Sequence, residues 1–374
     1  MARVLYVATS DIHINTFHVP YLDWLTGQGH TVDLAAEKRG EYRFESVDRH
    51  VWLHFPRSIA SKRHLRTYRQ LKQLIETGNY DLVHCHTPVA SAITRLAARR
   101  WRKNGGKVLY TAHGFHFYSG GPVLNWMTYY PAEALLSRLT DGIITINRED
   151  LGYARGALFR ADSYLIPGIG VQDSKFQALD AARRSARRQS LGYTEDQLLI
   201  LYIAEFIPRK NHDFLLRSFE QVAGRIEQSR LLLAGVGREM DRIHAEVKRA
   251  GLKNRVDFLG YRSDVENFAA IADIGVSTSR HEGLGLGLLE QMMCGVPVVA
   301  TQDKGHREFV EDGINGYLIE QGKTEAFCEA IIRVLTDQQL REALGRAAKV
   351  TAEEFAIKES LEAMAIVYKR FLSS

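Results

Sequence analysis

The sequence predicts an α/β protein of two domains, each built on a doubly wound parallel sheet. Apolar, β-branched runs alternate with helical segments through most of the chain, and strands separated by helices favour parallel sheets. With 374 residues, 45% of them hydrophobic, the chain is long enough for two separate cores. Near the middle, Pro167 and two nearby glycines suit a hinge. We therefore expect domains at 1–168 and 169–355, followed by an amphipathic helix at 356–374.

The first half opens with an apolar strand at residues 2–9, a polar loop at 10–16 and an amphipathic helix that ends near Gly27. Further strands are expected at 30–36, 51–55, 81–85, 108–112 and 141–146, with helices near 61–77 and over 89–103. Ligands of such sheets bind beyond the carboxyl ends of the strands. The polar loop offers His13, Asn15 and Thr16 as candidate ligand contacts, although a polar loop that caps the next helix would contain the same residues.

The second half repeats this alternation. Strands are expected at 198–204, 231–234, 256–259 and 274–277, and helices at 181–188, before 250, at 288–294 and from 324 onward. Arg209 and Lys210 open a helix after the first of these strands. Cations are unfavourable at a helix N-terminus, so this placement indicates a counter-anion, for which a diphosphate is suitable.

A glycine-rich loop follows the strand at 274–277. Gly283, Gly285 and Gly287 allow a ligand to approach the backbone closely, and the free N–H groups of the helix that begins there suit a phosphate. Glu282 and Glu290 would repel a bare phosphate, but they can accept hydrogen bonds from the vicinal diol of a ribose or a hexose. The loop therefore predicts a nucleotide-sugar site. The alternative is a helix N-terminus whose glutamates only complement the helix dipole.

The run Glu-Gly-Leu-Gly-Leu-Gly-Leu-Leu-Glu-Gln-Met-Met-Cys-Gly-Val-Pro-Val-Val at 282–299 is similar to the motif of glycosyltransferase family 4, whose members are retaining enzymes with the two-domain GT-B fold. The resemblance covers the whole chain and is strongest over 204–317. It implies that the first domain holds the acceptor, that the second holds the nucleotide sugar, and that transfer occurs in a cleft between them with retention of anomeric configuration.

The resemblance also implies roles for individual residues. His113, at the end of the strand 108–112, and Glu282 are the expected catalytic contacts to the donor sugar, although a lone histidine could instead be structural. The expected donor-binding residues are Arg209, Lys210, Arg262, Gly283, Leu284, Gly285, Leu286 and Glu290. His13, Asn15, Thr16 and His116 are candidates on the acceptor side. Arg262 is expected at the nucleotide base, and an ordinary surface arginine is its alternative.

Two positions depart from the family pattern. The Gly-Gly pair usual in the first loop is missing, and the usual glycine-arginine is replaced by Ala204 and Glu205. Arg209, beside Lys210, is a candidate to replace the missing arginine.

The sequence also bears on a metal, the donor and the acceptor. No Asp-x-Asp triplet occurs in the sequence, which argues against a metal held by paired aspartates, so we expect transfer without a metal or other cofactor. The segments 111–118 and 207–211 look like those of members that build capsule or exopolysaccharide units on polyprenyl diphosphate. This analogy implies a UDP-hexose or UDP-N-acetylhexosamine donor and a lipid-linked or glycan acceptor.

The net charge of +5 is concentrated in the first 170 residues. Two basic groups stand out, namely Arg57, Lys62, Arg63, Arg66, Arg69 and Lys72, and then Arg99, Arg100, Arg102 and Lys103. Because no nucleic-acid motif accompanies them, an anionic membrane is the better expected partner than DNA, and a solvated basic face is the alternative. No apolar run reaches the roughly 18 residues of a membrane span. The expected location is the cytoplasm, including the inner face of the plasma membrane.

Two rival functions remain open at this stage. A UDP-sugar epimerase shares the architecture and uses the same donor without an acceptor, and a non-catalytic nucleotide-sugar-binding protein would bind the donor without turnover. A dinucleotide-dependent oxidoreductase is disfavoured because its glycine fingerprint would lie after the first strand, and residues 10–16 contain no glycine.

Overall fold

The computed structural model describes residues 1–56 and 61–372. These residues form two compact units, unit 1 (residues 1–170 and the segment from 357 onward) and unit 2 (residues 171–356). Arg57, named above among the basic residues, lies outside the described residues.

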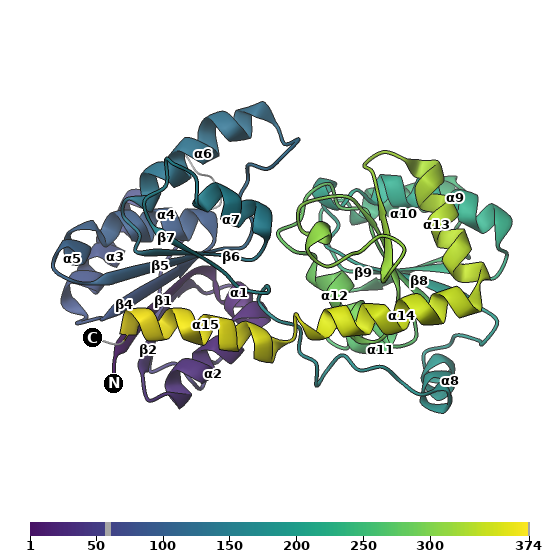
Figure 1. Cartoon of the computed structure of the whole chain (residues 1–374), viewed down its shortest axis with the longest axis horizontal. Coiled ribbons are helices and arrows are strands. Elements are labelled where there is room, and N and C mark those ends of the chain that lie inside the picture. The colour runs from purple at the N-terminus through teal and green to yellow at the C-terminus, as the bar shows by residue number, and fades with distance from the viewer. Residues whose placement is uncertain (57–60, 373–374) are drawn as a thin grey trace. The chain divides into compact units, whose positions relative to one another are not determined.

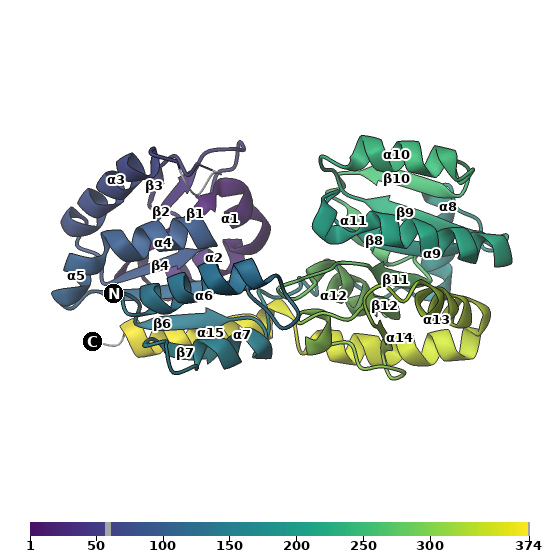
Figure 2. The same cartoon turned by 90° about the horizontal axis from the view of Figure 1, so that it is seen from above.

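Unit 1 is built on a seven-stranded parallel sheet with the strand order β3-β2-β1-β4-β5-β6-β7 (Figure 2). Its strands are β1 Arg3–Ser10, β2 Thr31–Glu37, β3 Arg49–Trp52, β4 Leu82–His86, β5 Lys107–Ala112, β6 Gly142–Thr145 and β7 Asp162–Leu165. Its helices are α1 Asp11–Phe17, α2 Val19–Gly27, α3 His64–Thr77, α4 Pro88–Ala97, α5 Arg99–Lys103, α6 Val123–Ser137, α7 Arg148–Ala154 and α15 Ile357–Leu372.

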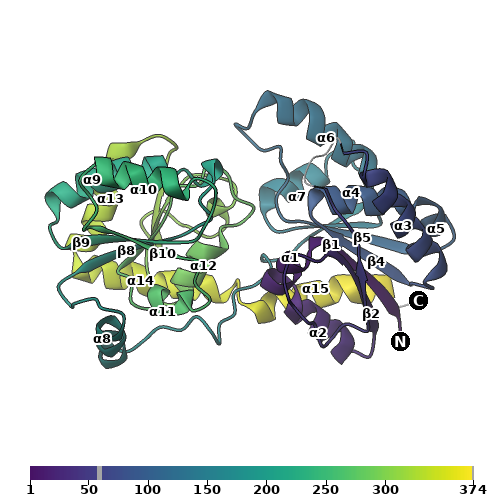
Figure 3. The same ribbon diagram turned by 180° about the vertical axis from the view of Figure 1, so that it is seen from behind.

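Helices cover both faces of this sheet, as expected for a doubly wound fold. Figures 1 and 3 show α2 and α15 on one face and α3 and α4 on the other. The last helix packs on α2, since the partly buried Trp24 of α2 stacks on the buried Tyr368 of α15 with ring centroids 5.7 Å apart. The Tyr368 hydroxyl and Nδ1 of His84 on β4 also share a hydrogen bond of 2.7 Å.

Unit 2 is built on a six-stranded parallel sheet with the order β10-β9-β8-β11-β12-β13. Its strands are β8 Leu198–Ile203, β9 Ser229–Ala234, β10 Val256–Gly260, β11 Ile274–Ser277, β12 Val298–Thr301 and β13 Gly316–Ile319. Its helices are α8 Ala181–Ser190, α9 His212–Arg225, α10 Met240–Arg249, α11 Val265–Ala269, α12 Leu286–Met293, α13 Thr324–Thr336 and α14 Gln338–Glu353, with short 3-10 turns η1 Pro208–Lys210 and η2 His306–Glu308. Figure 1 shows α9 and α13 on one face of the sheet and α11 and α14 on the other.

The structure corrects the expected loop at residues 10–16, which is the helix α1. The Ser10 hydroxyl accepts a hydrogen bond from the His13 amide at 3.4 Å and caps the helix. Asp11 is buried, and its carboxylate accepts hydrogen bonds from the amides of Arg39 and Gly40 at 2.9 and 3.0 Å. The amides that satisfy Asp11 lie far away in the sequence, so the local sequence does not show that this residue is buried. For this reason the segment resembled a loop.

The expected helix over 89–103 is also corrected, because the chain forms two helices, α4 and α5, that meet at Ala98. Within the described residues, none of the helices combines the length and the apolarity that a membrane crossing requires.

Candidate active site

Each sheet has one point at which the strand order reverses. In unit 1 the first strand, β1, lies between β2 and β4, and in unit 2 the first strand, β8, lies between β9 and β11. The segments that leave the carboxyl ends of these central strands diverge to opposite faces of the sheet, which is where doubly wound domains bind ligands. The candidate residues lie in these segments, with His13 after β1, Arg209 and Lys210 after β8, and Glu282 after β11.

In unit 2, Glu282 binds two cations at once. Nη1 of Arg209 lies 2.8 Å from one carboxylate oxygen of Glu282, and Nζ of Lys210 donates to the other oxygen. Nη1 of Arg209 also donates to the carbonyl of His281 at 2.6 Å. Glu282 and Lys210 are largely buried, whereas 42% of the Arg209 side chain is exposed. The cluster therefore holds one net positive charge, and Arg209 reaches solvent.

The backbone that carries these cations is attached to the loop after β11. The Tyr202 hydroxyl donates to the carbonyl of Lys210 at 2.7 Å, and the Thr278 hydroxyl donates to the same carbonyl at 3.0 Å. The Arg280 amide donates to the carbonyl of Arg209 at 2.9 Å. These hydrogen bonds join the segment after β8 to the segment after β11, and they fix the two cations relative to Glu282.

The pKa of Glu282 lies well below its usual value. Burial would raise this pKa, but the charges of Lys210 and Arg209, together with hydrogen bonds from Lys210 and Ser279, outweigh the effect of burial. Burial would lower the pKa of Arg209, yet the neighbouring carboxylate raises it. Glu282 and Arg209 are therefore both charged at neutral pH.

The glycine-rich loop has the geometry expected of a close backbone turn. Gly285 has φ = 107° and precedes the first residue of α12. A Cβ atom at Gly285 would lie 2.9 Å from Cδ2 of His306, so both the conformation and the space require glycine. Leu284 is buried, and its neighbours Gly283 and Leu286 are partly exposed. The loop packs on the segment after β12 and leaves part of its backbone open.

Glu290 lies on α12 in a different environment from Glu282. Burial is the main cause that raises its pKa to about 8; the charge of Lys175 opposes this shift, and the charge of Glu266 adds to it. Lys175 itself forms an ion pair of 3.3 Å with Glu266. At pH 7 Glu290 is therefore mostly protonated, whereas the sequence predicted a carboxylate here.

Arg262 is bound within its own turn. Its guanidinium makes two hydrogen bonds to the Asp264 carboxylate, at 2.7 and 2.6 Å, and lies over the Phe268 ring at 5.0 Å. Glu205, which stands where the family pattern has arginine, is exposed, and its charge acts on Arg209. The structure thus places Arg209, and not position 205, at the carboxylate of Glu282.

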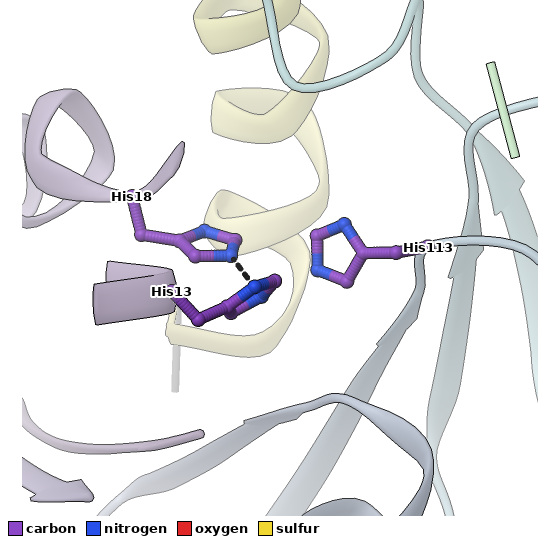
Figure 4. A group of neighbouring side chains, drawn as sticks. All are labelled: His13, His18 and His113. Carbon is purple, nitrogen blue, oxygen red and sulfur yellow. Dashed lines mark hydrogen bonds between the residues drawn. The ribbon is translucent and has the colours of Figure 1, made fainter. Parts of the chain in front are cut away.

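In unit 1, His113 is part of a histidine cluster. Figure 4 shows His13, His18 and His113 pointing toward one another, with Nε2 of His18 hydrogen-bonded to Nε2 of His13 at 3.2 Å. His86 of β4 contacts His113, with His86 Nδ1 and His113 Nε2 3.4 Å apart. His84, two residues earlier on the same strand, is fully buried, and its ring lies 4.2 Å from that of His86.

Burial lowers the pKa of all five imidazoles. The pKa of His13 falls to about 4 and that of His84 to about 3, and those of the other three lie well below the usual value. These side chains are therefore neutral at pH 7. They can donate and accept hydrogen bonds without adding charge to the site.

The structure separates the other candidates of unit 1 from this cluster. Asn15 and Thr16 are exposed, and the Thr16 hydroxyl donates to the carbonyl of Ile12 within α1. His116 is exposed and stacks on Tyr129, with ring centroids 4.9 Å apart. Of the predicted acceptor-side residues, only His13 lies beside His113.

The sequence interpretation missed three members of the cluster, namely His18, His84 and His86, and also Tyr6, whose ring stacks on His86 at 4.4 Å. His84 and His86 alternate along β4 and end it, which could have indicated two polar side chains near the ligand edge of the sheet. No local pattern marks His18 or Tyr6.

Comparisons with known proteins agree with this architecture. Residues 183–351 match the model of the glycosyl transferases group 1, and residues 21–167 match that of Glycosyltransferase Family 4. EpsD of Bacillus subtilis (strain 168), provisionally assigned as a glycosyltransferase, is 38% identical over 371 residues, which are 99% of this chain and 97% of EpsD.

A second relative is the UDP-Gal:alpha-D-GlcNAc-diphosphoundecaprenol alpha-1,3-galactosyltransferase of Escherichia coli. It is 26% identical over 289 residues, which cover 76% of this chain and 74% of the relative. Among solved structures, Anabaena HepE in complex with UDP and glucose has a TM-score of 0.81 at 20% identity and covers 99% of this chain and 100% of its own. That likeness establishes the shared fold.

Proposed function

Because this chain belongs to the glycosyltransferases, with a family 4 domain followed by a group 1 domain in the GT-B fold, we propose that it is a retaining, metal-independent hexosyl or N-acetylhexosaminyl transferase. The proposed donor is a UDP-sugar. The proposed acceptor is a lipid-linked or glycan intermediate in the synthesis of capsule, exopolysaccharide or another surface glycan. The observation that carries the proposal is the Arg209, Lys210 and Glu282 cluster at the strand-order reversal of unit 2.

This cluster suits a diphosphate that arrives together with a sugar. In the structure, Glu282 forms ion pairs with both cations. A diphosphate would replace the carboxylate as the partner of Arg209 and Lys210, and Glu282 would then accept hydrogen bonds from hexose hydroxyls. The backbone amides near Gly283 to Leu286 would add donors that carry no net charge. Glu290 is proposed to bind the ribose diol, and Arg262 the nucleotide base.

The proposal of metal independence is supported by the cations in the site. The leaving diphosphate gains negative charge as the glycosidic bond to the donor breaks, and Arg209 and Lys210 are fixed cations that can stabilise it. His113, a neutral imidazole, is proposed to contact the transferred sugar near its leaving group.

Retention and the acceptor class are supported by one of the relatives. The name of the Escherichia coli relative specifies an alpha-1,3 linkage, UDP-galactose as donor and a diphosphoundecaprenol-linked acceptor. We propose the same class of chemistry here, with a donor phosphate oxygen accepting the proton of the attacking hydroxyl.

The proposal is tested with the purified protein, a panel of labelled UDP-sugars and an N-acetylglucosaminyl diphosphate acceptor on a short prenyl chain. We expect transfer from at least one donor, an α-linked product by NMR and the same rate in EDTA. Absence of transfer together with absence of thermal stabilisation by any nucleoside diphosphate would contradict the function. A β-linked product would contradict retention. Loss of activity in EDTA that Mg²⁺ restores would contradict metal independence.

Incubation of the donor without acceptor tests the epimerase alternative, because an epimerase would change the sugar itself. A transferase leaves it unchanged or slowly hydrolyses it.

A peripheral contact of unit 1 with anionic membrane is also proposed, since a lipid-linked acceptor lies at that surface. Arg63, Arg66 and Arg69 are exposed along α3, and Val123, Leu124 and Met127 expose between 68% and 72% of their surface on α6. We expect co-sedimentation with phosphatidylglycerol vesicles but not with phosphatidylcholine vesicles, and release by salt.

The charge reversals Arg66→Glu and Arg69→Glu together should abolish this binding, whereas Lys358→Glu on the opposite face of the sheet should preserve it. Equal binding to both kinds of vesicle would argue against an electrostatic contact.

A further inference from the structure

The cluster of His13, His18 and His113 has the composition and spacing of a transition-metal site. One ring nitrogen from each residue lies within 4.8 Å of those of the other two, and the three rings converge from separate elements, α1, the residue before α2, and the end of β5 (Figure 4). We propose that these three histidines bind one divalent ion of the Zn²⁺ class.

The distances require little rearrangement. Two nitrogen ligands of a tetrahedral Zn²⁺ ion, each bonded at about 2.0 to 2.1 Å, lie about 3.4 Å apart. Nε2 of His13 and Nε2 of His18 are already 3.2 Å apart. The ring nitrogen of His113 lies within 4.8 Å of those of His13 and His18. To reach a separation of about 3.4 Å, it has to approach them by no more than about 1.4 Å. His13 and His113 are only partly buried, so their rings have room to turn.

The ligand chemistry selects the class of ion. The group consists of three imidazoles and contains no carboxylate, and imidazole favours Zn²⁺, Co²⁺, Ni²⁺ or Cu²⁺, whereas Mg²⁺ and Ca²⁺ prefer oxygen ligands. Three protein ligands leave a fourth position for water or for an oxygen of a bound molecule.

The surroundings also resemble those of a metal site. The Tyr6 hydroxyl lies 2.8 Å from Nδ1 of His18, so this ring is held from behind while Nε2 faces His13. Outer partners of this kind fix the orientation and the tautomer of metal-bound histidines. In the structure, His18 is hydrogen-bonded to His13, and His113 is hydrogen-bonded to His86. The ion would take the place of these partners.

A bound ion would affect transfer, and this part of the inference rests on the proposed function. If His113 contacts the transferred sugar, an ion that occupies its imidazole removes that contact. We therefore expect Zn²⁺ to inhibit transfer and a chelator to restore it. This effect is distinct from a metal requirement, because the metal-free protein is the active form.

Binding is measured with the full chain, free of any histidine tag and stripped with EDTA, in the absence of donor and acceptor. Isothermal titration with Zn²⁺ should give one ion per chain with a Kd tighter than about 10 µM. Co²⁺ should give the visible absorption of a tetrahedral site, and Mg²⁺ should give no binding heat. His13→Ala and His113→Ala should each weaken Zn²⁺ binding at least about tenfold.

His116→Ala is the matched control, since this histidine lies in the same unit but outside the cluster, stacked on Tyr129. It should bind Zn²⁺ as the unchanged protein does. Alanine is compatible with α1, so His13→Ala should stay folded, and His13→Gln provides a second variant whose fold is checked by circular dichroism.

A Kd weaker than about 10 µM in the unchanged protein would overturn the inference. So would a Zn²⁺ affinity of His13→Ala and His113→Ala equal to that of the unchanged protein. If Zn²⁺ binds as expected but leaves transfer unaffected, the metal site stands and the role of His113 in transfer fails. If the protein transfers no sugar at all, the binding measurement still decides the metal site.

Discussion

At the scale of single residues, Glu282 forms ion pairs with the same two cations that are proposed to bind the diphosphate of the donor. The carboxylate neutralises part of the charge of Arg209 and Lys210 while no diphosphate is present. The two glutamates of the glycine-rich motif therefore differ in state, because Glu282 is ionised between two cations and Glu290 is mostly protonated beside Glu266.

Glu282→Gln should separate binding from turnover. Removing the carboxylate frees Arg209 and Lys210 for the diphosphate, so the Kd for UDP should stay equal or become tighter. Turnover should fall about 100- to 1000-fold, which corresponds to about 2.7 to 4 kcal/mol, because the hexose loses its charged contact. Titration calorimetry and initial rates measure the two quantities.

Lys210→Ala is the complementary change and should weaken UDP binding as well as turnover. Arg217→Ala on α9, away from the Glu282 carboxylate, serves as the control. If Glu282→Gln weakened UDP binding as strongly as Lys210→Ala does, the exchange of partners would be wrong.

Glu290 should make UDP binding depend on pH. Its pKa of about 8 in the empty protein means that it carries a proton at pH 7. Ribose hydroxyls that donate to its oxygens favour the ionised form and lower this pKa, so UDP binding should release up to one proton at pH 7. The affinity should rise as the pH increases from 6 to 8.

Calorimetry in two buffers of different ionisation enthalpy counts the released protons. Glu290→Gln should release none and should show a flatter pH profile. Equal proton release by the two proteins would remove Glu290 from the ribose site.

At the scale of elements, the glycine-rich loop depends on one backbone conformation. Gly285→Ala should lower the stability of unit 2 by about 1 to 3 kcal/mol, because its φ of 107° strains any side chain and the new Cβ would meet His306. Gly224→Ala, in α9, is the control, because no atom lies within 4 Å of its new Cβ.

We expect Gly224→Ala to be neutral or to stabilise by up to about 1 kcal/mol. Thermal unfolding of the two variants provides the comparison. Equal melting temperatures would show that Gly285 is not conformationally required.

Some of these elements could be predicted from the sequence, and others could not. The apolar strands and the motif at 282–299 were recognisable, because a buried parallel strand and a glycine-rich turn have local patterns. Helix α1 was not, because its buried Asp11 is satisfied by amides 28 and 29 residues away. Of the five clustered histidines, only His13 and His113 were predicted, since each follows a strand that was expected from the sequence. The other members, His18, His84 and His86, come from other parts of the chain.

At the scale of the whole molecule, the chain returns to unit 1 through α15. Tyr368→Phe should destabilise unit 1 by about 1 to 3 kcal/mol, because it leaves the buried Nδ1 of His84 without its partner. All four tryptophans, Trp24, Trp52, Trp101 and Trp126, lie in unit 1. Urea unfolding followed by tryptophan fluorescence therefore reports on this unit.

Tyr261→Phe, at an exposed position of unit 2, should leave this transition unchanged. If the urea midpoint of Tyr368→Phe equals that of the unchanged protein, the hydrogen bond between Tyr368 and His84 contributes little to the stability of unit 1.

The account as a whole depends on where the nucleotide binds, and a crystal structure of the protein with UDP measures this most directly. We expect the diphosphate beside Arg209 and Lys210, with Glu282 released from at least one of them, and the ribose hydroxyls at Glu290. UDP bound elsewhere, with the Glu282 ion pairs intact, would contradict the account.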